Sequence, residues 1–204
     1  MFTSLYTTGL TVAAVGAAAR GTVVVLGFVR TFLLRKQFVT FQFGWTEALV
    51  SLEPLLLLVV AFGLFQSVEP GIPPTFDQTI AALLGGGLVL AGWTLVAWTF
   101  ISWPAIFSGH GVLQGQQLRT RGAYGLVRHP VYSGAVLVWL GLAVAFAHAA
   151  TLALAILYVV PTYLAYLRAE ETMMLASFGD QYRSYQRRVP QLIPRLYRKR
   201  RAPS

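Results

Sequence analysis

The residues best suited to chemistry fall in two places that are about forty residues apart. The first is Arg128-His129-Pro130-Val131-Tyr132, and the second is the pair Glu170-Glu171. The segment 109–134 around the first is polar and rich in glycine, aromatic and hydrogen-bonding residues. Loops of this length are usually functional or disordered, and glycine lets the backbone approach a ligand closely. Because this composition argues against disorder, we expect a ligand-binding loop.

Composition and the length of the apolar segments place the chain in a membrane. The 204 residues are 56% hydrophobic and 11% charged, whereas soluble domains carry about 25% charged residues. Three segments are long enough for a helix of about 20 residues to cross the bilayer, and two more are shorter. In chain order the five lie at 5–29, 48–65, 79–103, 132–147 and 151–167.

We therefore predict an all-α, polytopic membrane helix bundle with five transmembrane helices. The last two should form a tight helical hairpin with its tip at 148–150, and Pro161 should kink the fifth helix because proline lacks a backbone N–H. The bundle is expected to form a single integral membrane domain over 1–204. Within it, 1–103 supplies the N-terminal transmembrane helices, and 104–204 supplies a catalytic cofactor-binding region that includes the hairpin.

The basic residues predict the orientation of this bundle. Of the 16 Lys and Arg residues, all except Arg20 alternate onto one side, which places the N-terminus outside and the C-terminus in the cytoplasm. The hairpin then returns the chain to the side it left, so the His129 loop and Glu170 should be neighbours. Short loops suggest a prokaryotic plasma membrane. The net charge of +9 lies in cytoplasmic loops and a tail, so it indicates no nucleic-acid partner, and without cysteine we expect no metal site.

Two further patterns concern packing and the membrane surface. The third apolar segment is rich in small residues, which let membrane helices approach closely. The C-terminal region has apolar residues at helical spacing, which predicts an interfacial helix that ends before Pro190. The basic tail 195–201 is expected to bind anionic lipid. The small residues are Ala81, Gly85, Gly86, Gly87, Ala91 and Gly92, and the helically spaced ones are Leu175, Phe178, Tyr182 and Tyr185.

The last hundred residues carry a longer pattern that resembles the isoprenylcysteine carboxyl methyltransferase family. Related membrane phospholipid methyltransferases share its outline. The first half of the pattern is Leu118-x-Thr120-x-Gly122-x-Tyr124-x-x-Val127-Arg128-His129-Pro130-x-Tyr132-x-Gly134. The second half is Glu170-Glu171-x-x-x-Leu175-x-x-Phe178-Gly179-x-x-Tyr182-x-x-Tyr185-x-x-x-Val189-Pro190-x-x-Ile193-Pro194.

This resemblance implies a methyltransferase that uses S-adenosylmethionine, with a cytoplasmic cofactor pocket and a tunnel open to the bilayer for a lipidic substrate. The implied cofactor-binding residues are Gln114, Gln116, Gln117, Leu118, Arg119, Tyr124, His129, Pro130, Val131, Tyr132 and Glu170. The implied catalytic residues are Arg128, Arg168 and Glu171, and the implied substrate residues are Tyr166 and Arg168. Residue chemistry agrees: glutamate can bind the ammonium or ribose hydroxyls, tyrosine can lie against the sulfonium, and arginine can hold the carboxylate.

The sequence pattern does not identify the methyl acceptor. Family members place an arginine four residues before the first glutamate, where this chain has Tyr166, and Arg168 is rotated by about 200° on a helix. We expect a lipidic or small apolar acceptor, with carboxylate O-methylation as the leading guess. A carboxylate needs no base, whereas an amine or thiol must lose a proton. The alternatives are a phospholipid amine N-methyltransferase, an NADPH-dependent sterol-type membrane reductase and a protein with a degenerate site. Glu171 could also hold the loop in place of a chemical role.

Overall fold

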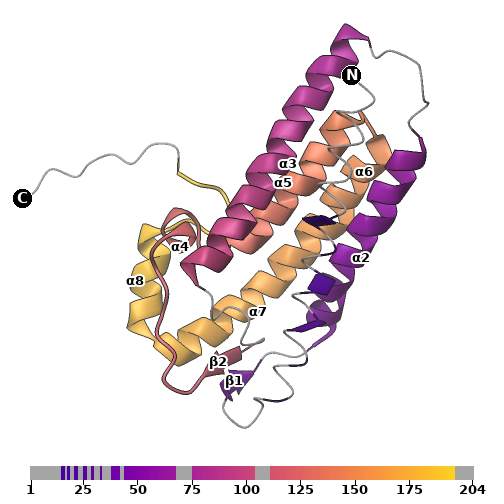
Figure 1. The fold of residues 1–204 in the computed structure, drawn as a ribbon. Coiled ribbons are helices and arrows are strands. Elements are labelled where there is room, and N and C mark those ends of the chain that lie inside the picture. The colour runs from indigo at the N-terminus through magenta and orange to yellow at the C-terminus, as the bar shows by residue number, and fades with distance from the viewer. Residues whose placement is uncertain are drawn as a thin grey trace, which may run out of the picture.

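The computed structural model describes residues 38–41, 44–67, 75–103 and 111–195, together with a few separate residues between 15 and 33 (Figure 1). Much of the first predicted span, including Arg20, lies outside the described residues. The same is true of the tail after Arg195. The fold described below is therefore that of the second half of the chain and of the helices on which it packs.

Helices make up most of this fold, with one small sheet at one end. The helices are α2 (Trp45–Gln66), α3 (Phe76–Ser102), α4 (Ala123–Leu126), α5 (Pro130–Ala145), α6 (Ala149–Leu154), α7 (Val160–Phe178) and α8 (Asp180–Arg188). A π-helical segment, η3 (Ala155–Val159), joins α6 to α7, and the strands are β1 (Phe38–Phe41) and β2 (Gly111–Leu113). The two strands correct the all-α prediction, although the fold is mostly helical.

Three of the described helical stretches are long and apolar enough to cross a membrane. They are Trp45–Gln66, Asp77–Ser102 and the continuous run Ala149–Phe178, whereas the apolar helix Pro130–Ala145 is shorter. At 1.5 Å per residue the shorter helix is about 24 Å long, against a hydrocarbon core of about 30 Å. The chain is therefore a membrane protein, and its five-span count and orientation stay predictions.

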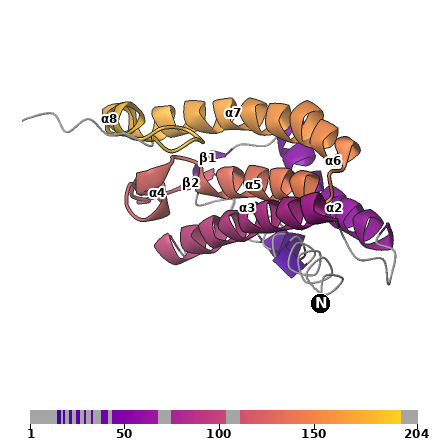
Figure 2. The ribbon, with the colours of Figure 1, turned by 90° about the horizontal axis from the view of Figure 1, so that it is seen from above.

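Helix α5 lies in the middle of the bundle, between α3 and α7, as both views show (Figures 1 and 2). A turn at Phe146–His148 leads into α6, and the His148 ring accepts a hydrogen bond from the backbone N–H of Thr151 at 3.3 Å. The π-helical segment η3 ends at Val159, two residues before Pro161. Proline cannot donate to the preceding turn, so the helix is irregular just before the residue for which we predicted a kink.

Helices α3 and α5 approach each other at two pairs of glycines. A Cβ atom on Gly92 would lie 2.5 Å from the carbonyl oxygen of Gly134, and one on Gly141 would lie 2.7 Å from that of Gly85. These distances exclude any side chain, so the helices pack backbone against backbone. The predicted packing surface is therefore confirmed at Gly85 and Gly92, and contradicted at Gly86 and Gly87, whose Cβ atoms would meet nothing within 4 Å.

The small sheet holds the N-terminal end of α2 near the polar loop. Strand β1, which precedes α2, pairs antiparallel with β2, which begins the polar loop. Figure 1 shows both strands at the end of the bundle where α2 begins. Two segments that are about seventy residues apart in the sequence thereby lie side by side at the end of the bundle where α2 begins.

Two expectations for the second half are wrong in detail. The segment 109–134 is not a continuous loop, because it contains β2 and α4, and α5 already begins at Pro130. Proline is favoured in the first turn of a helix, where its missing N–H is not needed. The residues from Leu175 to Tyr185 are not one helix either. Gly179, with φ 53°, ends α7 and turns the chain into α8, which ends at Arg188.

Candidate active site

The side chains of Arg128 and Glu171 form the centre of the site. Arg128 Nη2 lies 2.7 Å from Glu171 Oε1, and its Nε donates to the same oxygen at 2.8 Å. The second carboxylate oxygen, Oε2, accepts a hydrogen bond from Gln186 Nε2 at 3.0 Å. Both charged side chains are mostly buried, at 11% and 15% exposure. This ion pair ties the polar loop to α7 and, through Gln186, to α8.

The chain after α8 is held against the polar loop by hydrogen bonds from the loop. Arg128 Nη1 donates to the carbonyl oxygen of Val189 at 2.6 Å. The backbone N–H of Arg128 donates to the carbonyl oxygen of Pro190 at 2.8 Å. Ser133 Oγ donates to the carbonyl oxygen of Leu192 at 2.8 Å. We call residues 189–192 the C-terminal strap. The strap supplies the acceptors for the backbone N–H groups of Arg128 and His129, so the loop depends on the strap for these hydrogen bonds.

His129 lies between the two predicted carboxylates. Its Nε2 is 3.1 Å from Glu171 Oε1, and its Nδ1 is 3.5 Å from Glu170 Oε2. Burial alone would lower the pKa of His129, but Glu170 and Glu171 outweigh burial and raise its pKa to about 9. At neutral pH the ring is therefore charged, and both of its nitrogens carry a proton. The predicted proximity of the His129 loop to the two glutamates is confirmed.

The raised pKa of His129 predicts a loss of stability at alkaline pH. The folded state binds this proton more tightly than the unfolded state, so its stabilising effect is complete below pH 6.5 and disappears as the pH rises through about 9. The free energy of unfolding should fall by on the order of 3 kcal/mol over this range. Thermal unfolding in detergent between pH 6 and 10 measures it. His129→Gln, which does not titrate there, is the control, and parallel curves for the two proteins would contradict the prediction.

Tyrosine rings line the deeper side of this cluster. The ring of Tyr132 packs on that of Tyr163 at 4.9 Å and on that of Tyr166 at 5.6 Å, measured between centroids. Tyr163 and Tyr166 are buried, and both belong to the main core of the bundle. The His129 ring lies 6.3 Å from Tyr132. A buried aromatic cluster therefore connects the charged groups to the core of the bundle.

Tyr124 lies at the outer side of the same cluster. Its ring contacts that of Trp103 edge to face at 5.9 Å, and its carbonyl oxygen accepts a hydrogen bond from the Tyr185 hydroxyl at 2.7 Å. Burial, together with the charge of Glu170, raises the pKa of Tyr124 above its usual range. Helix α4, which carries Tyr124, therefore closes the site toward α8.

Other predicted residues lie outside this cluster. Gln116 closes a turn, in which its Oε1 accepts from the backbone N–H of Leu113 at 3.0 Å. The structure thus brings together Tyr124, Arg128, His129, Pro130, Val131, Tyr132, Tyr166, Glu170 and Glu171. Among the described contacts, none joins the exposed side chains Gln114, Gln117, Arg119 and Arg168 to them. Within the described residues, no group of three or more His, Cys, Asp or Glu side chains is arranged to hold a metal ion.

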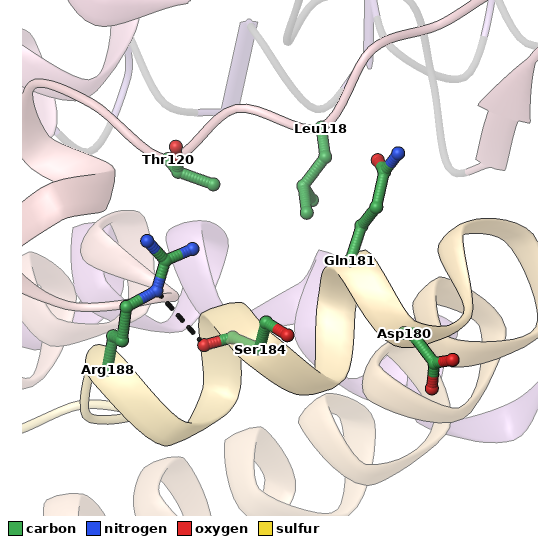
Figure 3. A pocket seen from close by; sticks show the side chains of 6 residues that line it. All are labelled: Leu118, Thr120, Asp180, Gln181, Ser184 and Arg188. Atoms are coloured by element: carbon green, nitrogen blue, oxygen red, sulfur yellow. Dashed lines mark hydrogen bonds between the residues drawn. The ribbon is translucent and has the colours of Figure 1, made fainter.

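An open pocket of about 530 Å³ separates the predicted cofactor strip 116–119 from the polar face of α8. Figure 3 shows Leu118 and Thr120 on one side of it and α8 side chains on the other, with Arg188 Nε donating to the Ser184 carbonyl at 3.1 Å. Its volume falls within the range of small-molecule sites. The lining residues are Leu118, Thr120, Asp180, Gln181, Ser184 and Arg188.

Sequence reasoning missed two contributors to the site. Tyr163 lies three residues before Tyr166 on α7, so helical spacing from a predicted substrate residue could have identified it. Gln186 and the strap carbonyls have no comparable signal. Their contact with Arg128 depends on how α8 folds back after Gly179, and backbone carbonyls leave no trace in a residue pattern.

Comparison with known proteins agrees with the sequence pattern. Residues 80–181, which are 102 of the 204, match the model of the phospholipid methyltransferase family. Methanethiol S-methyltransferase 2 of Bradyrhizobium diazoefficiens is 38% identical over 90 residues, which are 44% of this chain and 33% of that protein. A methanethiol S-methyltransferase of Crocosphaera subtropica is 33% identical over 84 residues, which are 41% of this chain and 31% of that protein.

The matched segments thus span about a third of the length of these two curated relatives. The family match covers α3, the polar loop, α5 and α7, which are the elements that carry the charged cluster. It confirms the resemblance to membrane methyltransferases on which the sequence interpretation rests. The chain belongs to the phospholipid methyltransferase family.

Proposed function

We propose that this protein transfers a methyl group from S-adenosylmethionine to a small apolar or lipidic acceptor within the membrane. The observation that carries the proposal is the convergence of the Arg128-His129 loop with Glu170 and Glu171 beside an aromatic cluster that belongs to the core of the bundle. Charged groups at one end and apolar groups at the other suit a polar donor and an apolar acceptor. The family match supports the same reaction class.

The residues present fit this cofactor. Oε2 of Glu170 is buried and forms an ion pair with His129 Nδ1 at 3.5 Å, but it accepts no hydrogen bond from the described part of the chain, so an ammonium group or a ribose hydroxyl could provide one. The rings of Tyr124 and Tyr132 offer faces for adenine or for a sulfonium cation. S-adenosylmethionine, when bound, supplies an electrophilic methyl group. The pocket beside Leu118 is open enough to hold part of such a molecule.

The chain itself then contributes alignment and the exclusion of water. We assign positioning roles to Arg128 and Glu171, because both are engaged with protein groups, and His129 holds Glu170 from the other side. A protonated His129 at neutral pH does not serve as a general base. These assignments replace the expectation that Arg128 and Glu171 take part in the chemical step.

Among acceptors, a thiol is better supported than a carboxylate. The two relatives carry the name methanethiol S-methyltransferase. A carboxylate acceptor would need an available cation beside the tyrosines, but Arg128 and the charged His129 ring are paired with Glu170 and Glu171, and Arg168 is exposed. Carboxylate and phospholipid amine methylation are therefore secondary candidates. The nicotinamide-dependent reductase has no support from the family or the relatives.

Replacing Glu170 by alanine should weaken the binding of S-adenosylmethionine by about 10- to 100-fold, since a hydrogen bond to a charged group contributes about 1.5–3 kcal/mol. Calorimetric titration of the purified protein in detergent measures the dissociation constant. Asp77→Asn, an exposed acid in the first turn of α3, is the matched control and should bind like the original protein.

The same titration tests the proposed function as a whole. The unmodified protein should bind S-adenosylmethionine and should show no heat with NADPH. Binding of NADPH alone would exclude a methyltransferase. Equal affinity of the original protein and Glu170→Ala for S-adenosylmethionine would refute the role of Glu170 while leaving the reaction class in place.

A further inference from the structure

Gln186 brings a neutral side chain of α8 into the charged cluster of Arg128, His129, Glu170 and Glu171. Its Nε2 donates a hydrogen bond to Glu171 Oε2 at 3.0 Å, and its own carbonyl oxygen accepts one from Arg128 Nη1 at 3.3 Å. Gln186 therefore contacts both members of the central ion pair. The sequence pattern did not single this residue out, and the match to the family model ends before it.

The two oxygens of the Glu171 carboxylate have different partners. Oε1 accepts a hydrogen bond from Arg128 Nε at 2.8 Å, and it lies 2.7 Å from Arg128 Nη2 and 3.1 Å from His129 Nε2. Oε2 is bonded to Gln186. An arginine and a carboxylate often form two parallel hydrogen bonds, one to each oxygen. Because Gln186 occupies Oε2, the carboxylate stays turned so that Oε1 serves Arg128 and His129 together.

His129 joins Glu171 to Glu170. Its Nε2 contacts Glu171, and its Nδ1 lies 3.5 Å from Glu170 Oε2. The other ionisable groups near this cluster are Arg128 of the polar loop, Tyr132 of α5, Tyr124 of α4 and Tyr182 of α8. Burial raises the pKa of Tyr124 and of Tyr182 above the usual range, so both stay neutral. The strap 189–192 carries no titratable side chain. The charge on the His129 ring is therefore balanced by the two glutamates.

We propose that Gln186 is a positioning residue that acts through Glu171 to keep His129 charged and Glu170 in place for S-adenosylmethionine. This inference rests on the proposed methyltransferase function and names a control of its cofactor site. Without Gln186, the Glu171 carboxylate can turn both of its oxygens toward Arg128. His129 Nε2 then loses the oxygen that it contacts, and only Glu170 remains to balance the charge of the ring.

The proton on His129 then sets how the affinity for the cofactor depends on pH. Burial lowers the pKa of His129, but Glu170 and Glu171 outweigh burial and raise it to about 9. Losing the contact with Glu171 removes one of the two groups that raise this pKa. A hydrogen bond to a charged group corresponds to about one pKa unit or more. In a variant without Gln186, the charged ring should therefore hold Glu170 only at lower pH.

The test is the affinity of Gln186→Met for S-adenosylmethionine at two pH values. Methionine is about as long as glutamine but cannot donate to Glu171. Calorimetric titration of the full-length protein in detergent should give about equal dissociation constants for the variant and the original protein at pH 6, where both rings are charged. At pH 8.5 the variant should bind about three- to eightfold more weakly, as a pKa lowered by about 1–1.5 units requires.

Tyr185→Phe is the matched control. Tyr185 precedes Gln186 on α8, and its hydroxyl donates to the carbonyl oxygen of Tyr124 at 2.7 Å. Phenylalanine therefore removes one hydrogen bond between α8 and the polar loop and leaves those of Glu171 in place. A loosening of α8 alone should change the affinity by the same factor at pH 6 and at pH 8.5, so the dependence on pH separates positioning from structure.

Gln186→Glu keeps the inference testable if Gln186→Met does not fold. A protonated carboxyl at this position can donate to Glu171 as the amide does, and an ionised one adds a negative charge close to the ring. Both forms favour the charged form of His129. The ratio of the dissociation constants at pH 8.5 and pH 6 should therefore be no larger than in the original protein. A larger ratio would contradict the role of Gln186.

Three results with Gln186→Met overturn the inference. Equal weakening at both pH values would give Gln186 a structural role only, and unchanged affinity at both would give it none. Tighter binding at pH 8.5 would show that a neutral ring frees Glu170 for the cofactor. In each case the methyltransferase function would stand. If the original protein bound no S-adenosylmethionine at either pH, the proposed function itself would fail, whatever the variants did.

Discussion

Replacing Gly92 by alanine should lower the free energy of unfolding by about 2–3 kcal/mol, the upper part of the range for overpacking a close contact. The added Cβ would lie 2.5 Å from the carbonyl oxygen of Gly134 and 2.8 Å from Cγ2 of Val138. A carbonyl oxygen in a helix cannot move aside as the end of a flexible side chain can. Helices α3 and α5 would have to separate along their whole interface, and the polar loop between them would move with them.

The measurement is the midpoint of thermal unfolding in detergent, with Gly141→Ala as a second test at the other glycine pair. Gly86→Ala and Gly87→Ala are the controls, because nothing lies within 4 Å of a Cβ atom at either position. The controls should be neutral or slightly stabilising, since alanine is the better helix former. An unfolding midpoint for Gly92→Ala that matches those of the controls would refute the close packing of α3 on α5.

Replacing Glu171 by alanine should be the most damaging change in the site. It would leave Arg128 without its counter-charge, and it would remove the carboxylate oxygens that His129 Nε2 and Gln186 Nε2 contact. Removing one partner of a buried ion pair costs about 3–5 kcal/mol, because the remaining charge stays buried. We expect the C-terminal strap to detach and the binding of S-adenosylmethionine to be lost.

Limited trypsin digestion measures detachment of the strap, because Arg187 and Arg188 lie at the end of α8, just before it. Cleavage there should become much faster in Glu171→Ala. The double variant Arg128→Met, Glu171→Met removes both charges, so it should recover much of the lost stability without recovering cofactor binding. Identical digestion of Glu171→Ala and the original protein would show that the ion pair does not hold the strap.

Sequence reasoning reached the meeting of His129 with Glu170 and Glu171, because a hairpin must return the chain to the side it left. For the packing face of α3, it predicted only that the segment is rich in small residues. It could not tell Gly85 and Gly92, which contact α5, from the neighbouring glycines. Which small residues face α5 depends on the rotation of α3 about its axis. A glycine-rich run leaves this rotation undefined, since its residues lie on every side of the helix.

The remaining errors have a common physical origin. The break at Gly179 has a local signal, but a single glycine in a helical pattern is often tolerated. The strands β1 and β2 are short, and they exist because they find each other across about seventy residues. Contacts of this kind belong to the assembled chain, and no window of the sequence contains both partners.

The C-terminal strap also sets an order for how the protein is made. Arg128 binds the carbonyl oxygens of Gln186 and Val189, which follow it by 58 and 61 residues. Helices α3 and α5 can pair through their glycines while the ribosome is still adding α7. The charged cluster, however, has no complete set of partners until synthesis has passed Leu192. A nascent chain in the membrane can therefore pair α3 with α5 well before the charged cluster is complete.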